Sequence, residues 1–355
     1  MKKTLLSCLL LIATLLGGCA QTPETTTTTP PATTAPVQQT APKEHLHLEE
    51  GTEFPASFDF ANTTATEQLF DMCEILDGVE VKVRPKSKSV TLTAKINNIK
   101  FTLNVNMSGS NGNTTPKQVV QCAKLFWYCY PQMYARFAAK TTPKTVTLKF
   151  EDFGYEVASA SGGEVHIHDK WLKNNPNDFD CLTHEFAHIM QGGWDGNYLP
   201  TSGQDTYMIE RFADYCRYLY SFKRGYFNDT CWELQTRKTE DSYVKGVRFW
   251  VWLDNTYSTK EIDIILRMQL AITSKTYPRA EWESGASAWN EIFKDTGAYG
   301  KTLEELWDEY AATTMSTASS KSRDFGKPTA LESAIPLRQS IRDRYPEADD
   351  YLKVN

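Results

Sequence analysis

Residues 182–191 have the sequence Leu-Thr-His-Glu-Phe-Ala-His-Ile-Met-Gln, and this stretch decides how the chain is interpreted. Apolar residues recur in it at the spacing of one helical face, so it predicts a helix. His184 and His188 are four residues apart and share one side of that helix. Two imidazoles at this spacing can bind one Zn²⁺, and Glu185 is placed to act on a water at the open position of the metal.

A second, acidic motif begins 22 residues after His188. Glu210 and Asp214 lie within residues 207–222, which we expect to form another helix, and their spacing puts both carboxylates on one face. Two histidines and one glutamate are a catalytic zinc set that leaves one position open. We expect Glu210 to be the third ligand and Asp214 to accept the spare N–H of a ligand histidine, with Asp214 as the alternative third ligand.

These residues together predict hydrolysis of a peptide bond. Zinc lowers the pKa of its bound water and polarises the scissile carbonyl group, and Glu185 is the expected general base. Two other functions stay open: a membrane-anchored surface protein that binds a partner without turnover, and a structural envelope protein with a chance motif. Glu185 argues against the first, because a binding module has no need for a base there.

The first 18 residues are typical of a lipoprotein signal peptide. Lys2 and Lys3 precede an apolar run, residues 5–16, that is too short to span a bilayer comfortably. The run ends in Leu16-Gly17-Gly18-Cys19, which resembles the lipobox of bacterial lipoproteins. The resemblance implies cleavage before Cys19, lipidation of Cys19, and a lipid-anchored protein of the bacterial cell envelope, at the outer membrane or cell surface.

Changes in composition divide the rest of the chain into four parts. Residues 19–47 are a Thr- and Pro-rich linker with too little apolar surface to fold. Residues 48–110 contain three alternating segments and predict a small, mainly antiparallel β domain. Residues 111–320 form the expected metallopeptidase domain, and residues 321–355 are a C-terminal extension. The expected strands are 79–83, 89–94, 99–105, 144–150 and 164–169, and a long helix is expected at 116–138.

Net charge and cysteine content bear on which partners the chain can bind and on which disulfides it can form. The net charge of −6 gives no electrostatic reason to expect a nucleic acid partner. Of eight cysteines, Cys8 leaves with the signal peptide and Cys19 takes the lipid. The remaining six permit up to three disulfides, whose pairing the sequence does not determine. Cys122 and Cys129 lie about two helical turns apart, which is too far for a bond between them.

Four segments resemble the basic secretory proteins, a family of zinc metallopeptidases of plants and bacteria. The similar segments are 182–191, 209–217, 242–253 and 289–310. The resemblance covers residues 112–315 and implies a zincin-like fold of the gluzincin type, a zinc cofactor and a protein or peptide substrate. It also implies that residues 162–169 form the edge strand of the substrate cleft. The chain departs from the family in its acidic composition and in Arg211, where the family has glycine.

Three further residues are weaker candidates. Tyr243 is similar in position to a family tyrosine and is a candidate donor to the developing oxyanion, with a packing role as the alternative. His166 and His168 alternate on an expected strand and face the same way. They are either partly exposed strand positions or a second metal site. The sequence therefore predicts an α+β fold, with a zincin-like domain preceded by a small N-terminal β unit.

Overall fold

The computed structural model describes most of the chain between residues 54 and 316. All described residues lie in one compact unit, Pro42–Asn355, and none in the preceding unit, Met1–Ala41. The signal peptide, Cys19, the linker, Tyr243 and the C-terminal extension therefore lie outside the described residues. The described ranges are 54–71, 79–139, 141–154, 157–176, 178, 181–192, 204–221, 247–259, 262–273, 290 and 292–316.

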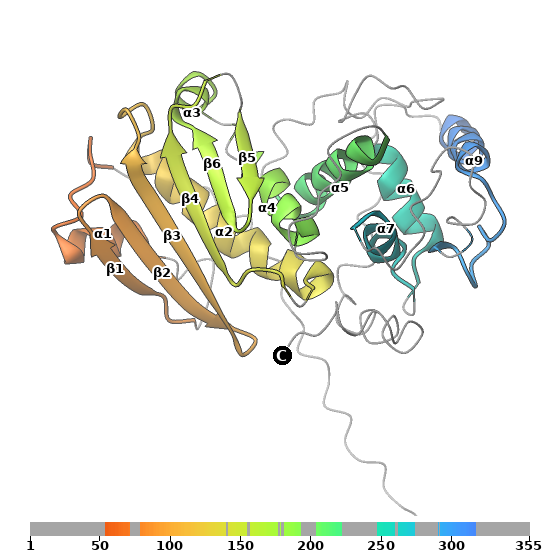
Figure 1. Ribbon diagram of the computed structural model, residues 1–355, viewed down its shortest axis with the longest axis horizontal. Coiled ribbons are helices and arrows are strands. Elements are labelled where there is room, and N and C mark those ends of the chain that lie inside the picture. The colour runs from red at the N-terminus through yellow and green to blue at the C-terminus, as the bar shows by residue number, and fades with distance from the viewer. Residues whose placement is uncertain are drawn as a thin grey trace, which may run out of the picture. The chain divides into compact units, whose positions relative to one another are not determined.

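The fold is α+β and is built on a six-stranded mixed sheet (Figure 1). Across the sheet the strands follow the order β1-β2-β3-β4-β6-β5. β1, β2 and β3 are antiparallel, β4 is parallel to both β3 and β6, and β5 is antiparallel to β6. The strands are β1 Lys82–Lys86, β2 Ser89–Ile96, β3 Ile99–Gly109, β4 Thr145–Glu151, β5 Ala158–Ser161 and β6 Glu164–His168.

The hairpin of β2 and β3 shows why these two strands form where the sequence predicts, whereas the first strand, expected at 79–83, lies at Lys82–Lys86. Leu92 lies opposite Leu103, and both side chains are fully buried. Asn97 and Asn98 make the two-residue turn at φ values of 48° and 66°. Asparagine tolerates this left-handed region, which two-residue hairpin turns require. The predicted antiparallel arrangement of the first three strands is confirmed.

The sheet continues across the expected domain boundary near residue 110. β3 pairs in parallel with β4, and Leu103 lies opposite Val146. The structure thus differs from the separate domain expected at residues 48–110, because its strands share one sheet with those that follow. A parallel pair needs a long crossover connection, which α2 supplies at Pro116–Phe137. Apolar alternation predicts a strand but not its partner, so the sequence could not show this pairing.

The first turn of α2 satisfies its free N–H groups locally. The Thr115 hydroxyl accepts from the Gln118 main-chain N–H, and the Gln118 side-chain oxygen accepts from the Thr115 N–H. This is a capping box. Pro116 stands at the first helical position, where its missing N–H costs nothing. The helix expected at 116–138 is confirmed.

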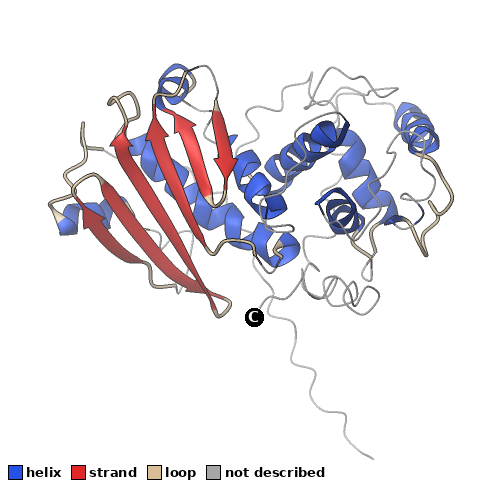
Figure 2. Ribbon diagram, in the orientation of Figure 1, coloured by secondary structure: helices blue, strands red, loops and turns tan. Residues whose placement is uncertain are grey.

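α2 connects the sheet to the helix that carries the two histidines, α4 at Cys181–Gly192. Figure 2 shows α2 running along one face of the sheet, with α4 next to it. The rings of Phe126 and Tyr130 stack on each other, and both meet Phe186 of α4 edge-on. These buried aromatic contacts fix α4 against α2.

The remaining helices complete the described fold. They are α1 Thr63–Leu69, α3 Asp169–Asn174, α5 Gln204–Tyr220, α6 Val247–Tyr257, α7 Ile264–Thr273 and α9 Leu303–Ser316. Figure 1 shows α5, α6 and α7 grouped beyond α4, on the side away from β1. No helix in the described part of the chain is both long and apolar enough to cross a membrane.

A buried charge network connects α2, α5 and α6 to the residue before α7. Arg136 is fully buried between two buried carboxylates. Its Nε donates to Asp263 at 2.7 Å and its Nη2 to Asp254 at 3.2 Å. Tyr215 accepts from Arg136 Nη1 at 2.9 Å and donates its own hydroxyl to Asp254. Burial raises the pKa of Asp254, and the Arg136 charge opposes that rise.

The four described cysteines lie inside the core and form no disulfide. Cys122 and Cys129 of α2, Cys181 of α4 and Cys216 of α5 are all buried. The expectation that Cys122 and Cys129 do not bond to each other is confirmed. Burial raises the pKa of the Cys122, Cys129 and Cys216 thiols, so these groups stay protonated and unreactive.

Candidate metal centre

α4 presents His184 and His188 on one face, as their spacing predicts. The two rings meet edge-on, with centroids 4.7 Å apart. Phe186, on the opposite face, is fully buried in the core, which fixes how the helix is rotated. Glu185 is the next residue round the helix and is itself buried, with 8% of its surface exposed.

α5 brings the Glu210 carboxylate to both histidines. Glu210 Oε2 lies 3.0 Å from His184 Nε2 and 3.6 Å from His188 Nε2. Ligand atoms of a tetrahedral zinc site are about 3.3 Å apart when each lies about 2.0 Å from the metal. The two distances bracket this value. Within the described part of the chain, these three residues form the one group of three or more potential ligands that could hold a metal ion, with ligand atoms all within 4.8 Å.

Asp214 lies behind His184, on the side away from the converging atoms. His184 Nδ1 donates to Asp214 Oδ1 at 2.7 Å, as predicted for a supporting carboxylate. This hydrogen bond leaves Nε2 of the same ring directed at Glu210. A metal-ligating histidine normally has its other nitrogen held in this way. The geometry therefore favours Glu210 over Asp214 as the third ligand.

Gln191 supports the second histidine, and the sequence interpretation missed it. His188 Nδ1 lies 2.9 Å from Gln191 Oε1. Gln191 follows His188 by three residues on α4, a spacing at which helical side chains meet. The signal was therefore present in the sequence, but a neutral amide in a helix attracts less notice than a carboxylate.

The charged groups of the site shift one another's pKa values. Burial lowers the pKa of His184, but Asp214 and Glu210 more than offset this and raise it to about 10. Burial raises the pKa of Glu210, but hydrogen bonds to His184 and His188 bring it well below its ordinary value. The pKa of Glu185 is raised by burial, against the opposing charges of the histidines. A raised carboxyl pKa suits a group that must take and return a proton near neutral pH.

Arg217 of α5 is a buried cation near Glu185. It forms an ion pair with Asp178, which also accepts from Trp171 Nε1 at 2.9 Å. Arg217 lies close enough to Glu185 for its charge to lower the pKa of that carboxyl, partly offsetting burial. The pair of Arg217 with Asp178 also links α5 to the segment just before α4.

His166 and His168 occupy β6 and do not join the metal group. His166 is half-buried, and its ring lies between the carboxylates of Glu151 and Glu164. His168 is buried, with Nδ1 3.8 Å from Asp152. Neither is among the residues that could hold a metal in the described ranges. The alternative of a second metal site at these histidines therefore gains no support.

The edge strand next to α4 is β5, which the sequence interpretation did not predict. Residues 162–169 were expected to form the edge, but β6 lies between β4 and β5 inside the sheet, so that expectation is wrong. β5 packs against α4 instead. Its sequence, Ala-Ser-Ala-Ser, has small side chains and no apolar alternation, so it gives no strand signal.

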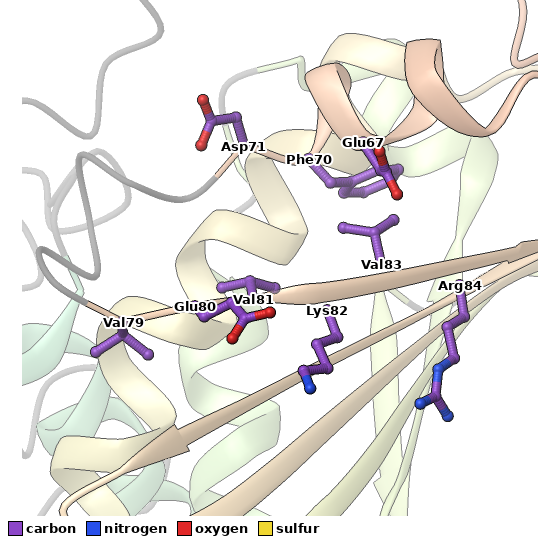
Figure 3. Close-up of a pocket in the computed structure, with 9 residues that line it drawn as sticks. All are labelled: Glu67, Phe70, Asp71, Val79, Glu80, Val81, Lys82, Val83 and Arg84. Carbon is purple, nitrogen blue, oxygen red and sulfur yellow. The ribbon is translucent and has the colours of Figure 1, made fainter.

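A cavity of about 500 Å³ opens between α1 and β1 (Figure 3). Its wall mixes Phe70 and valines with side chains of both charge signs, as in Glu67 and Lys82. No residue of the metal group contributes to it. This cavity is therefore not part of the candidate centre.

Comparisons of the chain with models of protein families, with curated proteins and with solved structures gave no match. The likeness to the basic secretory proteins consequently depends on the four sequence segments quoted above. Tyr243, a candidate from that likeness, and Cys19, from the lipobox resemblance, both lie outside the described residues.

Proposed function

We propose that the chain is a zinc-dependent peptidase that hydrolyses peptide bonds outside the cytoplasm. The convergence of His184 Nε2, His188 Nε2 and Glu210 Oε2 carries the proposal. Three protein ligands of these types leave a fourth tetrahedral position for water or substrate. Support also comes from the second nitrogen of each ring, because both are held by buried acceptors.

In this proposal each charged group has one task. His184, His188 and Glu210 hold the ion, which when bound lowers the pKa of a water and polarises the substrate carbonyl. Glu185 takes a proton from the attacking water and passes it to the leaving amine. Burial beside the site keeps the pKa of Glu185 raised, so the same carboxyl group can accept a proton and then donate it. Asp214 keeps the His184 ring in the orientation that the ion requires.

β5 is the proposed edge for an extended substrate. The His168 N–H donates to the Val157 carbonyl at 3.1 Å, so these two residues form a hydrogen-bonded pair of the antiparallel ladder. Such pairs alternate with non-bonded ones, so Ala158 and Ala160 direct their N–H and C=O groups away from β6. A peptide can pair with these groups as an added strand.

The other edge of the sheet is poorly suited to the same role. β1 contains Pro85, which has no N–H to donate, and the charged Lys82, Arg84 and Lys86. Proline and lysine are typical of edges that resist the addition of another strand. The contrast favours substrate pairing at β5, beside α4.

A zincin-like fold of the gluzincin type, and membership of the basic secretory proteins, belong to the same proposal. In support, two ligands come from α4 and the third from the following helix α5, with a sheet edge packed on α4. We also propose that lipid on Cys19 anchors the protein in the bacterial cell envelope. A Cys19→Ser protein should then move from the membrane fraction to the soluble fraction, and its retention in the membrane would contradict the anchor.

The test of function measures zinc and cleavage on the same samples. Full-length protein, Glu185→Gln and Glu67→Gln are loaded with zinc and assayed for metal content and for cleavage of casein. Glu67 is an exposed carboxylate of α1 and serves as the matched control. We expect about one zinc per chain in all three. Cleavage should fall about 10²–10⁴-fold in Glu185→Gln alone, because a base is lost but no ligand.

Two outcomes would overturn the proposal, and a third would remove one residue from it. A natural protein that takes up no zinc would make the histidine motif a coincidence. If all three proteins bind zinc but none cleaves casein, the result would point to the alternative of a surface protein that binds a partner without hydrolysing it. Equal cleavage by the natural protein and Glu185→Gln would remove Glu185 as the base.

A further inference from the structure

Gln191 is a fully buried amide that is engaged on both sides. Its Oε1 lies 2.9 Å from His188 Nδ1. Its Nε2 donates to the main-chain carbonyl of Ile209 at 3.3 Å and to Gln269 Oε1 at 3.0 Å. Three elements therefore meet at one side chain: α4, α5 and α7.

The chemistry of these partners decides which way the amide points. A main-chain carbonyl can only accept, so the atom of Gln191 that faces Ile209 must be the nitrogen. The oxygen then faces His188 and can only accept from it. Nδ1 of His188 must consequently carry a proton, and in the neutral ring Nε2 has the free lone pair. Nε2 is the atom that lies 3.6 Å from Glu210.

The position of Ile209 adds a second constraint. Ile209 immediately precedes Glu210 on α5, so the bond from Gln191 holds the main chain next to the third ligand. Gln191 thus contacts His188 and also the main chain next to Glu210. Gln191 is itself held from α7 by Gln269.

We propose that Gln191 is a positioning residue that sets the metal-binding tautomer of His188 and its spacing from Glu210. The inference depends on the proposed zinc site. Its consequence is a pre-arranged lone pair at His188 Nε2, with no energy spent on moving the proton when the ion binds. Partners of this kind typically contribute 10–100-fold to metal affinity.

The experiment compares three full-length variants by zinc affinity, measured by competition with a coloured chelator. Gln191→Met keeps the length of the side chain but has no acceptor for the histidine. Gln191→Glu keeps an acceptor, and in its neutral form an O–H can replace the N–H toward Ile209. Gln118→Met is the matched control. Gln118 lies on α2, is also buried, and donates to the main-chain carbonyl of Leu172 at 2.7 Å. The visible spectrum of the Co²⁺-loaded proteins reports the geometry at the metal without reference to activity.

We expect Gln191→Met to weaken zinc binding about 10–100-fold and to change the Co²⁺ spectrum. Gln191→Glu should stay within about threefold of the natural protein, and Gln118→Met should leave affinity and spectrum unchanged. Equal zinc affinity in Gln191→Met and the natural protein would overturn the inference. So would equal losses in Gln191→Met and Gln191→Glu, since packing alone would then explain them. If the natural protein binds zinc and cleaves casein in either of these cases, only this inference fails; if it binds no zinc, the proposed function fails with it.

Discussion

The two histidines of α4 are supported by different chemistry. His184 donates to the buried carboxylate of Asp214, whereas His188 donates to the neutral amide of Gln191. A carboxylate makes the ring a stronger base than an amide does. The proton and the proposed zinc ion should therefore compete mainly at His184.

This competition gives a pH prediction. The pKa of His184 is raised to about 10, so below that pH the free protein keeps a proton that zinc must displace. Apparent zinc affinity should increase with pH up to about 10. Isothermal titration calorimetry at pH 8, in two buffers of different ionisation enthalpy, should show proton release for the natural protein and less for Asp214→Asn. Identical enthalpies in both buffers for the natural protein would contradict this.

Most of the proposed centre could be predicted from the sequence because its residues lie on two helices at regular spacing. Helical periodicity puts His184 and His188 on one face and Glu210 and Asp214 on another, and the known ligand set of catalytic zinc sites predicts that these two faces meet. Gln191 lies at the same kind of spacing, but nothing in its residue type points to a histidine partner. The pairing of Arg217 with Asp178 joins residues far apart in the sequence, which periodicity does not report.

At the level of the elements, β5 gives a prediction for substrate binding. Ala160→Pro removes an N–H that points away from β6, so the sheet should be kept while one hydrogen bond to substrate is lost. We expect kcat/KM to fall about 3–10-fold. Ala160→Val is the control, since it adds bulk but keeps the N–H. An equal loss in both variants would assign the effect to the side chain instead of the strand edge.

The buried charge network predicts a large effect on stability. Arg136→Met leaves Asp254 and Asp263 buried without their cation, which should lower the free energy of unfolding by about 3–5 kcal/mol. Lys149→Met removes one partner of the half-exposed ion pair with Glu164 and should lower the free energy of unfolding by about 1 kcal/mol or less. Chemical denaturation measures both. Similar values for the two variants would contradict the role of the network.

Element prediction succeeded where the pattern was local. The long amphipathic stretch of α2, with its Pro and capping residues, and the alternating strands β2 and β3 were all placed correctly. β5 was missed because four small residues have no period. The parallel pairing of β3 with β4 joins strands that the whole of α2 separates in the sequence, so no local pattern contains it.

For the whole molecule, the continuous sheet predicts where the chain can be shortened. A fragment that begins at residue 112, where the resemblance to the basic secretory proteins starts, would lack β1, β2 and β3. One edge of β4 and the apolar side of α2 would then lose their partners. We expect this fragment to be insoluble or unfolded, and a chain that begins at residue 48 to fold, as judged by circular dichroism and gel filtration. A soluble, cooperative fragment from residue 112 would show that this part of the chain folds as an independent domain.

The four buried thiols bear on the order of events during maturation. In an oxidising compartment a cysteine can be oxidised only while solvent reaches it. Cys122, Cys129, Cys181 and Cys216 are enclosed between α2, α4 and α5, so folding removes them from any oxidant. In the proposed envelope location, folding and oxidation would compete in time for these side chains, and a chain that folds first would keep them reduced.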